Sequence, residues 1–222
     1  MKKGTTLMMI LSLLALTTTR AFAQEKESKV NWDLGGDLVS NYIWRGIKYG
    51  EGVNVQPYLE LSMGNFSLGA WGSADFNGFG EMDFYSKYVS NFGLSLGITD
   101  YYYTGSDWGN KQSHAFEVNA GYEIGILSLA GNIILNEASG AGSIGGDMYY
   151  EVGLNFNKWA CFIGGGNGWH TGDLGRDFEI TNIGVKTWKE LKFSDSFSIP
   201  ISASAILNPN TEQFYVVLSI SI

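Results

Sequence analysis

The 222-residue sequence predicts an all-β fold, a single antiparallel transmembrane β-barrel of about 12 strands with its apolar face outward. Three observations predict this class. The breaks between short segments alternate in length, the side chains within segments alternate between apolar and polar, and aromatic residues gather near the segment ends. Because the break at residues 41–53 is long enough to contain further pairing, about 10 to 14 strands fit the pattern.

The breaks that follow residue 24 fall into two length classes that alternate along the chain. The long breaks are residues 41–53, 76–81, 103–112, 136–147, 167–176 and 208–212. The short breaks are residues 64–65, 91–92, 123–125 and 157–158, with one exception at residues 188–196. Outer-membrane barrels have short periplasmic turns and long extracellular loops, whereas a soluble β-sandwich has no reason to sort its loops in this way.

The last segment shows the alternation most clearly. Its apolar residues stand at every second position and are Phe214, Val216, Leu218, Ile220 and Ile222. Successive side chains on a strand point to opposite faces, so one face of each segment is apolar and the other carries Gly, Ser, Asn and acidic residues. The single cysteine, Cys161, lies in phase with Trp159 and is expected on the apolar wall. This last segment also resembles the C-terminal signal read by the barrel assembly machinery, although it closes on Ile222 instead of an aromatic residue.

Aromatic residues are expected to form two girdles at the headgroup levels, one at each end of the barrel. The periplasmic set is Trp32, Phe66, Phe92, Tyr122, Phe156, Trp159, Trp188 and Phe197. The extracellular set is Tyr42, Trp44, Phe76, Tyr101, Tyr102, Tyr103, Trp169 and Phe214. The segments are about 9–11 residues long, which is the length that a tilted strand needs to cross a bilayer.

The N-terminus has the three parts of a secretory signal peptide. Lys2 and Lys3 precede an apolar run over residues 7–16, and Ala21-Phe22-Ala23 is a small-x-small cleavage site. We therefore expect a signal peptide over residues 1–23 and one barrel domain over residues 24–222, located in the outer membrane of a diderm (Gram-negative) bacterium. The apolar run is shorter than the roughly 20 residues that a spanning helix requires.

The charge of the chain excludes one class of partner. The signal contains three of the 14 basic residues and none of the 22 acidic ones, so the mature chain has 11 basic residues and a net charge of about −11. Binding to nucleic acid requires a basic face, so no nucleic acid is expected as a partner. The expected partners are outer-membrane lipid and lipopolysaccharide, the barrel assembly machinery and small hydrophilic solutes.

A motif in the first long break carries a family resemblance. Residues Ser40-Asn41-Tyr42-Ile43-Trp44-Arg45-Gly46-Ile47, with Pro57 further on, resemble the start of the TorF-type porin family. The pattern of that family is Ser, Asn or Asp, Tyr, two variable residues and Arg-Gly, with a Pro about a dozen residues later. The resemblance implies a small outer-membrane barrel with a pore role, and it supplies no catalytic residues.

Arg45 has two interpretations that the sequence leaves open. In the functional one, its guanidinium lies at the pore mouth, where it pairs with a carboxylate or binds an anion. In the structural one, it forms a salt bridge that holds the first loop in place.

The polar face of the segments contains the other candidate site residues. We expect the pore to be lined by Asp33, Asp37, Arg45, Glu60, Asp83, Lys87, Glu117, Glu151 and Glu179. A ring of carboxylates focuses negative potential, so an open lumen would prefer cations. Alternatively, these groups pair with one another and plug the barrel, because barrels of about eight strands are filled and those of 16–18 strands leave a channel.

The sequence therefore predicts a porin for passive diffusion of small hydrophilic solutes, with mild cation preference, no enzyme activity, no cofactor and no metal. The first alternative is a plugged barrel that acts as a surface receptor or adhesin through its long loops. The second is an outer-membrane lipid hydrolase with a Ser–His pair. His114 stands beside Ser113, but adjacent strand residues face opposite ways, and His170 lies in a loop near Asp173 with no marked nucleophile.

Overall fold

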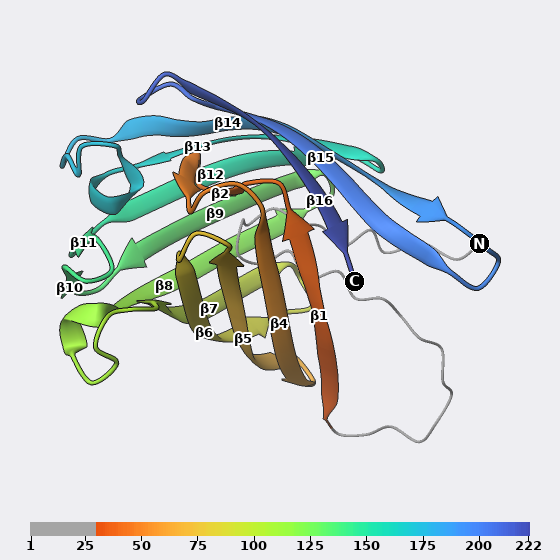
Figure 1. The fold of residues 1–222 in the computed structure, drawn as a ribbon, viewed down its shortest axis with the longest axis horizontal. Coiled ribbons are helices and arrows are strands. Elements are labelled where there is room, and N and C mark those ends of the chain that lie inside the picture. The colour runs from red at the N-terminus through yellow and green to blue at the C-terminus, as the bar shows by residue number, and fades with distance from the viewer. Residues whose placement is uncertain (1–29) are drawn as a thin grey trace.

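The computed structural model describes residues 30–222, and its strands form one closed antiparallel barrel (Figure 1). The fold class and the strand number predicted from the sequence are confirmed. The expected signal peptide, its cleavage after Ala23 and the first residues of the mature chain lie outside the described residues.

Twelve strands form the barrel within residues 30–222. They are β1 (Asn31–Val39), β4 (Asn54–Met63), β5 (Phe66–Asp75), β6 (Gly80–Val89), β7 (Leu94–Tyr103), β8 (His114–Ile124), β9 (Leu127–Ile134), β12 (Met148–Asn155), β13 (Trp159–Gly166), β14 (Glu179–Lys192), β15 (Ser198–Asn208) and β16 (Gln213–Ser221). Each barrel strand pairs with the next one along the chain, and β1 closes on β16. At this seam Gly36 and Ile222 exchange two backbone hydrogen bonds of 2.9 Å. Closure satisfies the strand edges that would otherwise lie open.

The remaining elements are short. They are β2 (Tyr42–Trp44), β3 (Ile47–Tyr49), η1 (Lys111–Ser113), β10 (Glu137–Ala138), β11 (Ser143–Ile144) and η2 (Gly168–His170). In the described part of the chain, no helix is long and apolar enough to cross a membrane.

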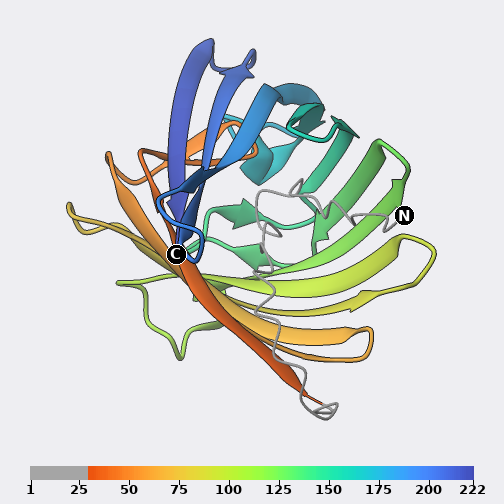
Figure 2. The same ribbon diagram turned by 90° about the vertical axis from the view of Figure 1, so that its right-hand side faces the viewer.

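The predicted sorting of the connections by length is confirmed in part. The connections of ten residues or more all lie at one end, here called the loop end, and the opposite turn end, which Figure 2 views, has connections of two to five residues. Residues 76–79 and 209–212, which fall in breaks expected to be long, connect their strands at the loop end with only four residues each.

The exception expected at residues 188–196 is wrong, because β14 continues to Lys192 and β15 begins at Ser198. Only residues 193–197 connect these two strands. The predicted break at residues 188–196 therefore lies largely within the long strand β14 and is not a long turn.

The expected orientation of the two faces is also confirmed. Large apolar side chains point outward, and Leu218 in β16 is 57% exposed. The opposite face carries polar groups, such as Asp37, which pairs in register with Gln56 on one side and Ser221 on the other. Cys161 lies in β13 between the outward-facing Trp159 and Ile163, as expected.

The two aromatic girdles differ in outcome. At the turn end, Trp32, Phe66, Phe92, Trp159 and Phe197 are exposed, as expected. At the loop end, Phe76 and Phe214 are exposed, but Tyr42, Trp44, Tyr101 and Trp169 are buried in one interior cluster. The second girdle was therefore wrong for these four residues, because Tyr101 faces inward from the wall strand β7 and the connecting segments that carry Tyr42, Trp44 and Trp169 fold into the barrel.

The break at residues 41–53 contains a hairpin that enters the barrel. Strands β2 and β3 pair with each other and with no barrel strand in the described structure. Arg45 and Gly46 form the two-residue turn, with φ of 52° and 82°. Positive φ at both central residues is the signature of a type I′ turn, which joins two twisted strands with a sharp reversal.

Candidate functional site: a hairpin that closes the lumen

The tip of the hairpin is held by an ion pair inside the barrel. Nη1 and Nη2 of Arg45 donate to the two carboxylate oxygens of Glu117 in β8, at 2.6 and 2.9 Å. Arg45 is 3% exposed and Glu117 is fully buried. Bidentate geometry gives both strength and direction to an arginine–carboxylate pair. Of the two interpretations of Arg45, the structure agrees with a salt bridge that holds the first loop.

The carboxylate of Glu117 accepts four hydrogen bonds in all. Besides Arg45, it accepts hydrogen bonds from the Tyr101 hydroxyl at 2.8 Å and from the Asn119 amide at 2.6 Å. A buried charge is tolerated only when it is paired and hydrogen-bonded, and this carboxylate meets both conditions. The hydrogen bonds from Tyr101 and Asn119 therefore fix the carboxylate of Glu117 in the position where it binds the guanidinium of Arg45.

Aromatic rings and a histidine surround the guanidinium of Arg45. Its Cζ atom lies 4.4 Å from the ring centre of Trp44 and 4.5 Å from that of Tyr149. Both ring nitrogens of His170 lie near Nη1, at 3.3 and 3.5 Å. Burial, and after it the charge of Arg45, hold the pKa of His170 well below its ordinary value. His170 is therefore neutral near pH 7 and does not repel Arg45.

The backbone of the hairpin tip is fixed to the opposite wall. The Thr181 hydroxyl donates to the carbonyl of Arg45 at 3.2 Å, and the Asn208 amide donates to the carbonyl of Gly46 at 3.0 Å. A Cβ atom on Gly46 would lie 1.7 Å from the carbonyl oxygen of Thr181. Only glycine allows this approach, so the Arg-Gly sequence is explained by the turn and by its contact with β14.

A second polar group lies beside the first. Glu151 in β12 accepts hydrogen bonds from the Tyr149 hydroxyl at 2.5 Å and from the Asn182 amide at 2.8 Å. Tyr149 also forms the cation–π contact with Arg45, so the two groups share a member. Together they place buried polar groups in the barrel interior at the level of the hairpin tip.

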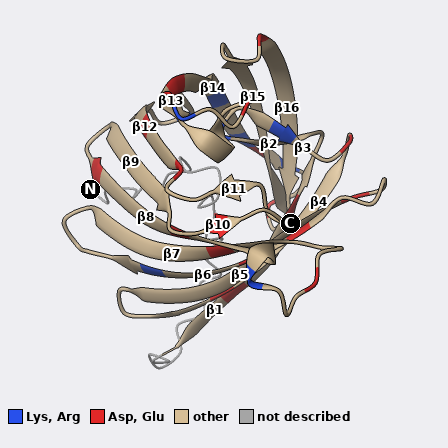
Figure 3. Ribbon diagram, turned by 90° about the vertical axis from the view of Figure 1, so that its left-hand side faces the viewer, with Lys and Arg blue, Asp and Glu red and all other residues tan. Residues whose placement is uncertain are grey.

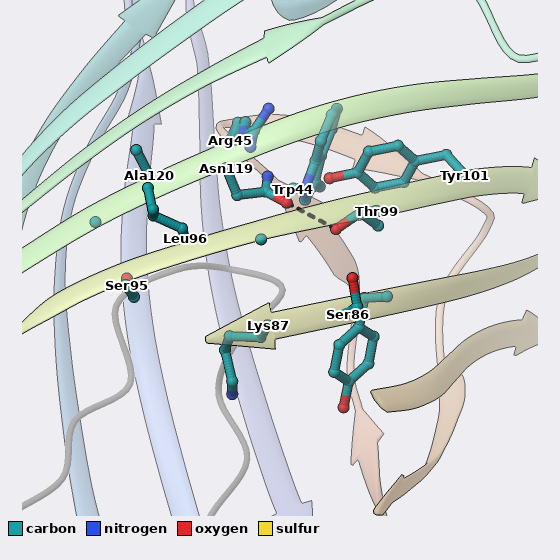
Figure 4. Close-up of a pocket in the computed structure, with 13 residues that line it drawn as sticks. Trp44, Arg45, Ser86, Lys87, Ser95, Leu96, Thr99, Tyr101, Asn119 and Ala120 are labelled. Atoms are coloured by element: carbon teal, nitrogen blue, oxygen red, sulfur yellow. Dashed lines mark hydrogen bonds between the residues drawn. The ribbon is translucent and has the colours of Figure 1, made fainter. Parts of the chain in front are cut away.

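The lumen on the turn side of the hairpin is partly open to water. Trp44 and Arg45 form one border of a pocket whose inward-facing wall includes Lys87, Thr99 and Asn119 (Figure 4). The Thr99 hydroxyl donates to the Asn119 side-chain oxygen at 2.9 Å. This pocket ends at the hairpin, and the larger part of its accessible lining is apolar.

The predicted site residues divide into three groups by position. Asp33, Asp37, Glu60 and Lys87 are partly buried on the inward face, and Lys87 lies 3.5 Å from Glu60. Arg45, Asp83, Glu117 and Glu151 are buried at the level of the hairpin. Glu179 begins β14 at the loop end and is exposed, so it does not lie with the others. Figure 3 shows acidic and basic segments as seen from the loop end.

Sequence reasoning missed part of this site. Trp44, Tyr101 and Trp169 were expected in a lipid-facing girdle but belong to the interior cluster. The parity of Tyr101 relative to the apolar face of its segment would have placed it inside. No local signal reveals that Trp169 and His170 turn inward, because that follows from contacts between distant segments.

The two histidines lie in different environments, and neither hydrogen-bonds to a hydroxyl in residues 30–222. His114 faces outward, with Nδ1 2.9 Å from Asp100 and Nε2 2.9 Å from the carbonyl of Trp108. His170 is enclosed with Arg45. The described residues therefore contain no Ser–His arrangement of the kind that a lipid hydrolase would use. They also contain no group of three or more His, Cys, Asp or Glu that could hold a metal ion.

Comparison with known proteins gives a family. The family model described as "Bacterial protein of unknown function (Gcw_chp)" matches residues 23–198. The chain belongs to this family. No curated protein matches the sequence. The Arg45 hairpin and all but the last two barrel strands of this Gcw_chp member lie within the matched residues.

Two solved structures resemble the barrel. The outer membrane phospholipase (OMPLA) dimer of Salmonella typhi with bound calcium is 11% identical, with a TM-score of 0.44, and the match covers 86% of this chain and 90% of that one. Outer membrane phospholipase A from Escherichia coli is 9% identical, with a TM-score of 0.40, and the match covers 89% and 92%. No site residue is transferred from either enzyme.

Proposed function

We propose that this Gcw_chp member is an outer-membrane channel for small hydrophilic solutes, mildly cation-preferring, which the β2–β3 hairpin holds closed. The proposal includes the outer membrane of a diderm bacterium as its location and the TorF-type pore role that the Arg-Gly motif implies. Lipid, lipopolysaccharide and the barrel assembly machinery are the partners that such a location requires. No catalytic residue is part of the proposal.

One observation supports the proposal: a hairpin inserted into the barrel is anchored to an inward-facing carboxylate by a buried ion pair. A hairpin packed only by apolar contacts would be a fixed part of the core. The Arg45–Glu117 bridge is the charged part of the attachment, and its loss would weaken the hold on the tip, which the hydrogen bonds from Thr181 and Asn208 also fix. Asp33, Asp37 and Glu60 on the turn side of the hairpin would then favour cations, with Lys87 as their positive neighbour.

The decisive experiment is single-channel conductance of the refolded mature chain in a planar bilayer with a salt gradient. We expect rare openings of the wild type and frequent openings of the Arg45→Met/Glu117→Gln double variant, with a cation-selective reversal potential. The matched control is Lys48→Met, which removes a cation of the same hairpin whose partner, Glu51, is exposed. This control should behave like the wild type.

Silence of both the wild type and the double variant, in barrels shown to be folded and inserted, would contradict the proposal. In that case the buried cluster would be a permanent plug. The weight would then move to a surface receptor or adhesin that acts through the long loops.

A further inference from the structure

Strand β6 presents two carboxylates to the interior: Glu81, which interacts with the hydroxyls of Tyr42 and Tyr103, and Asp83, which has no side-chain hydrogen-bond partner. Asp83 is fully buried and Glu81 is 4% exposed. Neither oxygen of Asp83 accepts a hydrogen bond of ordinary geometry, and neither does Oε2 of Glu81. Within residues 30–222, no lysine, arginine or histidine lies within ion-pair distance of either carboxylate. Glu117, in contrast, has both a cationic partner and hydrogen-bond donors.

Aromatic side chains of three elements surround the pair. In the register of the sheet, Asp83 lies between Trp71 of β5 and Tyr101 of β7. Glu81 lies opposite Tyr103 of β7. The inward hairpin adds Tyr42, whose ring centre is 5.4 Å from that of Trp71. The electron-rich faces of such rings attract cations.

The nearby cations are already engaged. Arg45 is bound in bidentate fashion to Glu117, and Lys48 on the same hairpin pairs with Glu51 at 3.0 Å. Two ionised carboxylates in the interior without a counter-charge would carry a large desolvation penalty. A proton shared by the two carboxylates would remove one charge, and it is the alternative that the test must distinguish. A cation between the two carboxylates satisfies several oxygens at once.

We propose that Glu81 and Asp83 bind a weakly hydrated monovalent cation, K⁺ or the ammonium group of a solute, between β6 and the closed hairpin. The aromatic walls favour such a cation over Mg²⁺, which gives up its water reluctantly. The inference rests on the proposed channel, in which this site would bind a permeating cation next to the β2–β3 hairpin.

The test is the thermal midpoint of the full mature chain refolded in detergent, measured at equal ionic strength in potassium, ammonium or N-methylglucamine chloride. A ligand that binds only the folded state stabilises it. We expect potassium or ammonium to raise the midpoint saturably by about 2–4 °C over N-methylglucamine, which is too bulky for the site. A rise with both salts identifies a general monovalent site, and a rise with ammonium alone identifies an amine site.

Asp83→Asn should abolish this rise, and Glu81→Gln provides a second variant if Asp83→Asn does not fold. The matched control is Glu123→Gln, which removes an equal charge near the turn end of β8. A rise that persists in both Asp83→Asn and Glu81→Gln, or one absent from the wild type, overturns the proposal. The second result means that the pair shares a proton.

The readout does not depend on conduction, so the two proposals fail separately. A barrel that shows the salt-specific rise but never conducts keeps the cation site and contradicts the channel. A barrel that conducts without the rise keeps the channel and contradicts the site.

Discussion

Arg45 and Glu117 meet inside the barrel although 72 residues separate them in the chain. Arg45 occupies the turn of a hairpin in the left-handed region of φ, and Glu117 faces inward from the wall strand β8. The strain of a non-glycine residue at positive φ is of the order of 1 kcal/mol or more, and it persists only where surrounding contacts compensate for it. The bidentate bridge supplies that compensation.

Breaking the bridge on one side should be more harmful than removing both partners. We expect Arg45→Met or Glu117→Gln alone to lower the free energy of unfolding by about 3–5 kcal/mol, because each leaves a buried group without its partner. The double variant should recover part of this loss. Urea unfolding of all four proteins in detergent measures the coupling, and additive losses would contradict a direct bridge.

Gly46 should be intolerant of a side chain. In Gly46→Ala the new Cβ would meet the carbonyl of Thr181, so we expect a loss above about 2 kcal/mol from contact and strain together. Gly52→Ala is the matched control, because Gly52 has a similar positive φ of 76° and no atom within 4 Å of its Cβ position. Strain alone should cost that control about 1 kcal/mol. Equal losses would mean that the tip does not contact β14.

Acid should weaken the closed hairpin through His170. Its folded-state pKa is lowered by burial and by Arg45, so the unfolded state binds the proton more readily. The stabilisation is therefore complete above the ordinary histidine pKa of about 6.5 and is lost as the pH falls below it. Urea midpoints from pH 8 downward measure this. His170→Asn should show a flatter profile between about pH 6.5 and 5, where most carboxylates do not yet titrate.

Charge selectivity should depend on the turn-side carboxylates. Asp33 and Glu60 face each other in register between β1 and β4 and are only partly buried, so they meet passing ions. Asp33→Asn/Glu60→Gln should lower the cation-to-anion permeability ratio, and Lys87→Met should raise it. Each change is introduced into the Arg45→Met/Glu117→Gln variant, which is expected to open often, and the reversal potential in a salt gradient measures the permeability ratio. An unaltered ratio in a conducting barrel would remove these residues from the conduit.

Local pattern was sufficient for most of the barrel. The alternation in residues 213–222 and the two classes of connection predicted its strand number, its outward apolar face and the sorting of its ends. The inward parity of Asp37, Glu117 and Glu151 followed from the same rule. These properties depend on residues one or two positions apart, which is the range over which a strand repeats.

The interaction partners of each inward-facing side chain could not be predicted from the alternation along a strand. Nothing near Glu117 indicates that Arg45 pairs with it, and nothing near Asp83 indicates that it has no partner. Trp44 and Trp169 have the composition and spacing of a lipid-facing girdle, yet they pack together with ring centres 4.9 Å apart inside the barrel.

By itself, the sequence determined a closed, lipid-facing barrel with long loops at one end, because backbone pairing and the partition of side chains between lipid and lumen act locally. Only the tertiary structure decided that residues 42–49 turn inward and that Arg45 reaches Glu117 and His170. The physical reason is that the inward hairpin is stabilised by contacts with strands and loops up to 162 residues away along the chain, and periodicity contains no record of such contacts.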